Sequence, residues 1–226
     1  PLISYGVSDG ADLHIDHIEL MTMGSSARAL WKGKTVGHIE LQVPGHHNLL
    51  NAAGVLATGL NLGFGASELL TGLGTFRGTG RRFELIGTVH GVRVIDDYGH
   101  HPVEIEAVLD AAREAFPKKS ICLVFQPHRY TRTRDYFDEF VRVLYKADKV
   151  ILTDIYSAGE KVILGVNSLA LMDSINKTTH KVSFEKELTD LAKKALQQID
   201  QDSILIVMGA GSVGRVAKDI LNIVKS

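Results

Sequence analysis

The chain has 226 residues, enough for one large domain or two small ones, and 45% of them are hydrophobic and 23% are charged. A formal net charge of −1 provides no overall field for nucleic acid, and no apolar run approaches the ~18 residues of a membrane span, so neither partner is expected. The single cysteine, Cys122, cannot form an internal disulfide, which indicates a reducing compartment and a cytoplasmic protein. Because the first residue is proline rather than methionine, we expect a processed chain or a piece of a longer one.

The first region is predicted to be rich in β-strands. Apolar residues alternate at Leu13 and Ile15 and, after a slip in the pattern, at Ile18 and Leu20. Further strand patterns lie on either side of the turn at residues 32–34. These alternations are typical of strands with one buried face.

Two helices are expected next, at residues 48–60 and 67–73, with Ser67 as the N-cap of the second. The stretch G-T-F-R-G-T-G-R-R-F that follows is rich in glycine and arginine, which is typical of a linker or hinge. We therefore place a domain boundary there and expect one domain at residues 1–81 and another at residues 82–226.

After the linker, strand and helix patterns alternate. Pro102 suits the first turn of a helix, where its missing N–H costs nothing. Continuous apolar strands between amphipathic helices predict an α/β fold with a mostly parallel, Rossmann-like sheet covered on both faces. The expected strands are 83–89, 92–96, 121–125, 149–153, 181–184 and 203–208, and the expected helices are 103–116, 133–146, 168–176, 185–199 and 212–225.

The motif G-A-G-S-V-G, residues 209–214, follows the last strand pattern. In dinucleotide-binding folds such glycines let a pyrophosphate approach a helix N-terminus, so a nicotinamide-dependent oxidoreductase is one interpretation. Only twelve residues follow Gly214, which leaves no second strand to bring an acid to a ribose. We favour the alternative, a tight strand–helix turn beside a site for some other anion.

The triplet G-K-T at residues 33–35 resembles the end of a P-loop. A P-loop needs a glycine five positions before Gly33, where this chain has Arg28, and it needs a helix afterwards, where a strand is expected. We reject this interpretation.

Polar side chains crowd the end of the strand at 92–96, in D-D-Y-G-H-H-P. A metal site, a strand-end cap with partly buried histidines, and a catalytic strand end are the three interpretations, and no second cluster with ligand spacing supports the metal. The strand at 121–125 is followed by Q-P-H-R-Y-T-R-T-R, whose arginines are suited to a carboxylate or phosphate. If these two strands are neighbours, the two clusters face each other across one crevice.

Two other polar pairs have both structural and functional interpretations. Asn48 and Asn51 lie on one side of an expected helix start, where they either cap the helix or bind a base or sugar. Arg81 and Arg82 are either a solvated pair in a linker or a clamp for a phosphate.

Four motifs in this chain order resemble the Mur ligases: G-H-H-N-L-L-N-A-A, F-R-G-T-G-R-R-F-E, D-D-Y-G-H-H-P and F-Q-P-H-R-Y-T-R-T-R-D. The resemblance runs from about Val43 onward and is greatest to members that join L-alanine to UDP-N-acetylmuramate in peptidoglycan precursor synthesis. A sibling that attaches a ready-made peptide to the same sugar acid is the alternative. The chain departs from the family because it lacks the P-loop and, by resemblance, the acid and histidine that hold Mg²⁺.

The resemblance implies an amide ligation in which ATP phosphorylates the muramic acid carboxylate, and the amine of L-alanine then attacks the acyl phosphate. It also implies roles for individual residues. On the ATP side they are Asn48 and Asn51 near the adenine, Arg82 at the phosphates, Asp97 near the ribose and Tyr98 beside the nucleotide. At the reacting centre they are His100, His128 and Arg129, with Arg132 at the alanine carboxylate and Gly209 and Gly211 lining the amino-acid side; no metal ligand is expected in this chain.

Overall fold

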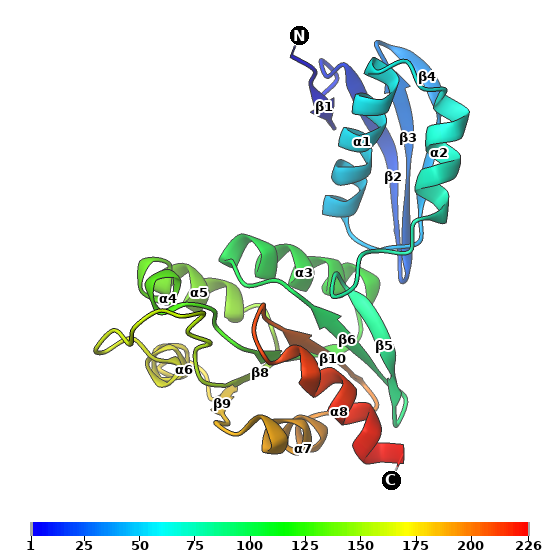
Figure 1. Cartoon of the computed structure of the whole chain (residues 1–226). Helices are drawn as coiled ribbons and strands as arrows, with labels where there is room; N and C mark the ends of the chain where they lie inside the picture. Colours follow the sequence, from blue (N-terminus) through cyan, green and yellow to red (C-terminus); the bar gives the residue numbers. More distant parts are fainter. Residues whose placement is uncertain (1, 226) are drawn as a thin grey trace. The chain divides into compact units, whose positions relative to one another are not determined.

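A computed structural model of the chain describes residues 2–225 (Figure 1). The residues group into two compact units, which divide between Gly78 and Thr79, while Asp110–Ala115 group with the first unit. The assignment of one part to ATP and the other to the amino acid remains a prediction. Within residues 2–225, no helix combines the length and apolar composition that crossing a membrane requires.

The first unit is a sheet with helices packed on one face. Its strands are β1 (Tyr5–Gly6), β2 (Leu13–Met21), β3 (Gly24–Trp31) and β4 (Lys34–Leu41), in the order β1-β2-β3-β4. Pairing is antiparallel except between β1 and β2. Helices α1 (His46–Asn61) and α2 (Ala66–Thr75) supply apolar side chains to a core that includes Leu13, Ile15 and Leu49.

The sequence predicted the local features of this unit well, with one error. The slip in β2 is a register shift between Asp16 and Glu19, as expected. Gly33 lies in the turn between β3 and β4, and β4 begins at Lys34, so G-K-T is a hairpin and not a P-loop. Ser67 is not an N-cap, because α2 begins one residue earlier and its cap is Gly65.

The second unit is a mostly parallel sheet covered on both faces. Its strands run in the order β5-β6-β10-β7-β8-β9. Within this sheet, the described strands pair in parallel except for β5 and β6, which are antiparallel. Helices α7 and α8 pack on one face, and α3 and α5 lie on the other (Figure 1). The strands are β5 (Glu84–Val89), β6 (Val92–Asp97), β7 (Ser120–Phe125), β8 (Lys149–Leu152), β9 (Val182–Phe184) and β10 (Ser203–Met208). The helices are α3 (Pro102–Ala115), α4 (Tyr130–Asp135), α5 (Phe137–Leu144), α6 (Ser168–Asn176), α7 (Leu188–Gln198) and α8 (Gly214–Lys225).

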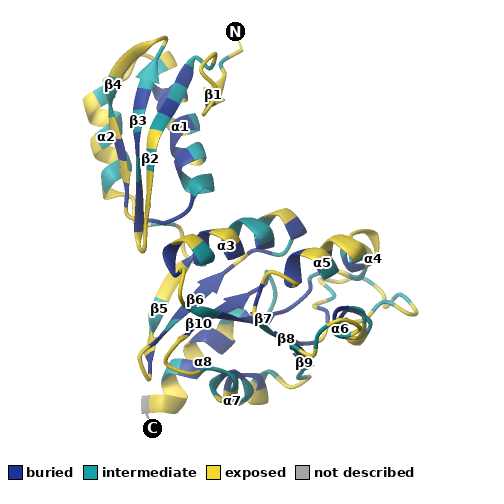
Figure 2. Cartoon of the chain, turned by 180° about the vertical axis from the view of Figure 1, so that it is seen from behind, coloured by how far each residue is buried: buried dark blue, intermediate teal, exposed yellow. Residues whose placement is uncertain are grey.

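The middle of this sheet is its core. All six residues of β10 are buried, and Figure 2 shows mostly buried residues along its neighbours β6 and β7 as well. A central strand with helices on both faces must be apolar on both sides, which explains the continuous run S-I-L-I-V-M. The α/β fold with a mostly parallel sheet is therefore confirmed.

Two details of the second unit differ from expectation. The helix expected at 133–146 is two helices, α4 and α5, because the backbone leaves the helical region at Tyr136, with φ −117° and ψ 29°. The condition that β6 and β7 are neighbouring strands is not met, because β10 lies between them. Crossover connections decide strand order, and a local sequence pattern carries no signal for an insertion between two strands.

Candidate functional site

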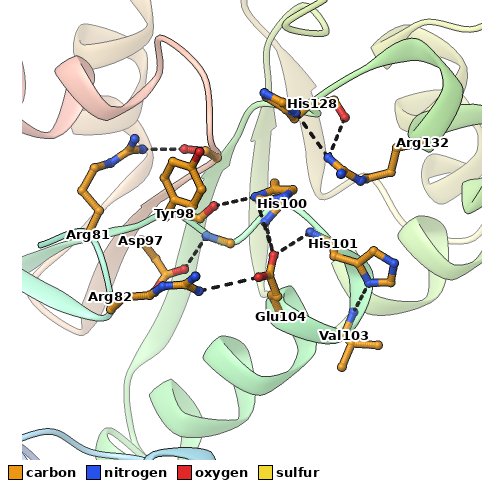
Figure 3. Close-up of polar contacts among 12 residues, drawn as sticks. Arg81, Arg82, Asp97, Tyr98, His100, His101, Val103, Glu104, His128 and Arg132 are labelled. Atoms are coloured by element: carbon orange, nitrogen blue, oxygen red, sulfur yellow. Dashed lines mark hydrogen bonds and ion pairs between the residues drawn. The ribbon is translucent and has the colours of Figure 1, made fainter. Parts of the chain in front are cut away.

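The carboxyl ends of three adjacent strands form the candidate site. Asp97 at the end of β6 and Phe125 at the end of β7 both pair with Met208 at the end of β10. The loops at residues 98–101, 126–129 and 209–213 therefore emerge at one edge of the sheet, and we call them the strand-end site. Although β10 separates their strands, the two outer loops converge, and the ring centroids of His100 and His128 lie 5.4 Å apart (Figure 3).

Asp97 organises the loop that carries the histidines. Its Oδ2 accepts a hydrogen bond from Phe83 N at 2.8 Å, and its Oδ1 accepts one from Gly99 N at 2.6 Å. Burial raises the pKa of the Asp97 carboxyl to about 6, although both N–H groups oppose that shift. Both oxygens of this carboxyl are therefore engaged with backbone groups in this structure.

Asp96 lies on the other face of β6 and pairs with Arg81. The Nε of Arg81 lies 3.1 Å from Asp96 Oδ2, whereas Oδ1 of the same carboxyl is buried with no hydrogen-bond partner among the described residues. Burial raises the pKa of Asp96 despite the guanidinium beside it. From the sequence, Arg81 was interpreted together with Arg82 as a solvated pair or a phosphate clamp, and no role was assigned to Asp96.

Arg81 also fills the space above the glycine-rich turn. Its guanidinium donates to Gly209 O and lies 5.2 Å from the Tyr98 ring centroid. A Cβ placed on Gly214 would be 2.6 Å from Arg81 Cζ, so this guanidinium packs directly on the start of α8. The turn therefore holds an arginine side chain where a dinucleotide fold would hold a pyrophosphate.

The Arg82 side chain approaches a different carboxylate from the one that Arg81 contacts. Its side chain is half exposed, its Nη1 lies 3.7 Å from Glu104 Oε1, and its guanidinium lies 5.9 Å from the Tyr98 ring centroid. Two arginine side chains thus approach one tyrosine ring (Figure 3). A ligand stacked on or placed beside Tyr98 would meet a positive field suited to phosphate.

Glu104 holds the start of α3 and the first histidine. Its Oε2 accepts from the backbone N–H groups of His100 at 3.0 Å and His101 at 3.1 Å. Burial opposes its ionisation, but these N–H groups and the nearby cations lower the pKa of Glu104. The Nδ1 of His100 lies 3.1 Å from Tyr98 O and 3.6 Å from Glu104 Oε2.

The loop after β7 brings its basic residues to the same place. Arg132 Nη1 lies 3.3 Å from His128 Nδ1 and 3.2 Å from His128 O. Burial, together with the neighbouring cations, lowers the pKa of His128. Arg129 precedes α4 with a φ of 73°, a conformation that costs a non-glycine residue free energy and is often found at functional sites. The third arginine of this segment, Arg134, forms an ion pair with its neighbour Asp135.

Three contributors were missed by the sequence analysis. The Tyr156 ring stacks on His128, with centroids 5.4 Å apart and planes inclined by 18°. Glu160 accepts from Thr131 N at 3.0 Å and so caps α4. Gln126 Oε1 accepts from Val213 N at 3.0 Å and fixes the glycine-rich turn. Tyr156 and Glu160 follow β8, so the tendency of parallel sheets to place sites at strand ends was the available signal.

The two predicted asparagines lie in the first unit, on α1. Gly45 is the N-cap of this helix, and no side chain caps it. The Asn48 amide donates to Pro44 O at 2.7 Å, whereas Asn51 is exposed. Neither residue therefore acts as an N-cap through its side-chain oxygen.

Within residues 2–225, no group of three or more His, Cys, Asp or Glu side chains is placed to hold a metal ion.

Comparisons with known proteins agree on one family. Residues 81–211 match the model of the Mur ligase, glutamate ligase domain. A UDP-N-acetylmuramate–L-alanine ligase of Acidithiobacillus ferrooxidans is 40% identical over 222 residues, which cover 96% of this chain and 48% of that protein. One from Geobacter sulfurreducens is 40% identical over 212 residues, covering 93% of this chain and 46% of that protein.

Solved structures give the same result. The crystal structure of the UDP-N-acetylmuramate–alanine ligase MurC from Thermotoga maritima has a TM-score of 0.82 and 27% identity to this chain. The match covers 99% of this chain and 48% of that one. This chain thus spans about half the length of the curated relatives that it matches.

Proposed function

Because the chain belongs to the Mur ligase family, we propose that it is the carboxyl-terminal half of an ATP-dependent ligase that joins L-alanine to UDP-N-acetylmuramate. The observation that carries the proposal is the convergence of His100 and His128 at the end of β10, with Arg129 beside His128 in the same loop and Arg132 on α4, which follows it. The reaction would be a step of peptidoglycan precursor synthesis in the cytoplasm, where ATP is available.

The proposed reaction requires the strand-end site to stabilise a negative charge. ATP converts the carboxylate of the sugar acid to an acyl phosphate, the amine of L-alanine attacks its carbonyl carbon, and phosphate leaves. Attack places a negative charge on the former carbonyl oxygen, and donors held in place before the reaction stabilise such a charge most effectively. His100, His128 and Arg129 are the groups that we assign to this reacting centre.

The nucleotide side is assigned to residues around Tyr98. Tyr98 is 38% exposed and has the cations of Arg81 and Arg82 near its ring, which suits a nucleotide whose phosphates approach those cations. Asp97 supports this region by holding the backbone at Gly99. In the first unit, we assign Asn48 and Asn51 to the adenine.

The amino-acid side is assigned to Arg132 and the glycine-rich turn. A guanidinium presents paired donors that match a carboxylate, and Arg132 is fixed by His128. A Cβ on Gly209 would lie 2.8 Å from Gln126 O, and one on Gly211 would lie 2.5 Å from Gln126 Oε1. Glycine at these two positions therefore lets the turn pack closely against the loop after β7, which carries His128 and Arg129.

Two alternatives use the same residues differently. A sibling ligase that attaches a peptide to UDP-N-acetylmuramate would need the same stabilisation of charge at the reacting carbon. A nicotinamide-dependent oxidoreductase rests on the glycine-rich turn alone, and the Arg81 side chain packed on that turn counts against it.

The test is ligation by the full-length parent protein. We would supply ATP, UDP-N-acetylmuramate and, in separate reactions, L-alanine, glycine, L-serine or a tripeptide, and measure the product by mass spectrometry. The proposal predicts the highest kcat/KM with L-alanine. Preference for the tripeptide would favour the sibling, and the absence of amide formation with every amine would refute a ligase.

A further inference from the structure

The two histidines of the strand-end site have opposite partners at Nδ1. At His100, Nδ1 lies 3.1 Å from the Tyr98 carbonyl oxygen and 3.6 Å from the Glu104 carboxylate (Figure 3). Both neighbouring groups can only accept a hydrogen bond, so Nδ1 of His100 carries a proton. A neutral imidazole has a single N–H, so its Nε2 presents a lone pair.

The arrangement at His128 is reversed. Its Nδ1 lies 3.3 Å from Arg132 Nη1, and a guanidinium can only donate (Figure 3). The Nδ1 of His128 therefore accepts that hydrogen bond and carries no proton, which leaves the proton on Nε2. Burial and the surrounding cations lower the pKa of His128, which supports the neutral form.

We propose that the two histidines divide the work of the ligation: Nε2 of His100 accepts a proton from the ammonium group of the amino acid, and Nε2–H of His128 donates a hydrogen bond to the oxyanion. The inference rests on the proposed function and adds a distinct role for each ring. The centroids are 5.4 Å apart, so an acceptor and a donor lie close enough to serve one reacting group.

The proton balance of this step is complete. The amino acid arrives as R–NH3⁺ and gives one proton to His100, and the resulting amine forms the new C–N bond. The π electrons of the carbonyl move to oxygen, where His128 and Arg129 stabilise the charge, and then return as the bond to the phosphate oxygen breaks. The nitrogen loses its second proton to the departing phosphate, which leaves as HPO4²⁻, and His100 later releases its proton to water.

The charges around the rings fit this division. The carboxylate of Glu104 lies beside His100, where it stabilises the positive charge that a base acquires. His128 is instead surrounded by the cations of Arg129 and Arg132, with the carboxylate of Glu160 the opposing influence. The two rings thus differ in their charged neighbours, a carboxylate beside His100 and two guanidinium groups beside His128.

The tautomers can be measured on this chain without any substrate. Long-range ¹H–¹⁵N spectra of ¹⁵N-histidine-labelled protein at about pH 8, where imidazoles are neutral, distinguish the two tautomers. We expect a proton on Nδ1 of His100 and on Nε2 of His128. The exposed His90, in the turn between β5 and β6, is the control and should show averaged tautomers. The reverse pattern, or averaging at either site, would overturn the inference.

The matched substitution in the full-length parent tests the roles. A glutamine amide can donate a hydrogen bond but cannot take up a proton, so His128→Gln should keep kcat within about 10-fold, while His100→Gln should lower it by about 10²-fold or more. Equal losses, or a larger loss at His128, would contradict the division. If the wild-type parent forms no amide, the proposed function fails and the two catalytic roles fail with it, whereas the tautomers measured on this chain test separately the hydrogen bonds from which the roles are inferred.

Discussion

Replacement of Asp97 by asparagine should remove a loss of stability that the second unit undergoes as the pH rises through about 6. Burial raises the pKa of this carboxyl from the ordinary 3.8 to about 6, so the unfolded chain loses the proton before the folded protein does. The stability that the folded protein gains by holding this proton more tightly than the unfolded chain is fully present below pH 3.8. It is lost as the pH rises through about 6. At about 1.4 kcal/mol per pKa unit, the loss amounts to about 3 kcal/mol.

Asparagine stays neutral at every pH but keeps only one of the two acceptors of the carboxyl group. Its amide oxygen can accept from one of the N–H groups of Phe83 and Gly99, whereas its NH2 group can only donate, so the other N–H loses its acceptor. Asp97→Asn should therefore be less stable than the wild type by about 1–3 kcal/mol at about pH 4, and should gain up to about 3 kcal/mol relative to the wild type by about pH 7.5, because only the wild type must ionise in the interior.

Amide hydrogen exchange can measure this difference locally. Exchange of the β10 amides gives the opening free energy of the second unit at each pH, and the β3 amides of the first unit are an internal control. A stability difference between the variant and the wild type that stays constant from about pH 4 to pH 7.5 would refute the reasoning, because it would mean that the two backbone N–H groups offset burial.

Three further predictions concern single side chains. Arg129→Ala in the full-length parent should lower kcat by at least ~10²-fold, the usual cost of losing an oxyanion donor, and a near-normal rate would contradict that role. Gly211→Ala should destabilise the chain by about 1–3 kcal/mol in urea unfolding, because its Cβ would lie 2.5 Å from Gln126 Oε1, whereas Gly72→Ala, with nothing within 4 Å, should be tolerated. Cys122 is buried and its pKa is raised to about 12, so thiol reagents should label it only after unfolding, and rapid labelling of folded protein would contradict its placement.

Local patterns predicted the elements of the second unit, because periodicity and capping are properties of adjacent residues. Pro102 begins α3, as its fixed φ suggests, and strands ended where polar clusters began. The position of β10 between β6 and β7 was not predictable in this way. Strand order depends on which crossover packs on which face, and the same run S-I-L-I-V-M is compatible with any central position.

The two adjacent arginines illustrate the limit for site residues. The sequence offers no means of distinguishing Arg81 from Arg82, yet a φ of 59° at Arg81 turns its side chain toward Asp96 and the glycine-rich turn, while Arg82 reaches Glu104. Backbone conformation at a single residue made this difference. Tyr156 escaped prediction for a similar reason, since its contact with the site depends on how the loop after β8 folds back.

The central claim, that this site joins an amine to an activated carboxylate, can be tested most directly with isotopes. UDP-N-acetylmuramate labelled with ¹⁸O in its lactyl carboxylate would be incubated with ATP, L-alanine and the full-length parent, and the released phosphate analysed by mass spectrometry. Passage through an acyl phosphate predicts one ¹⁸O atom in each phosphate released. Phosphate without ¹⁸O, formed alongside amide product, would contradict the account.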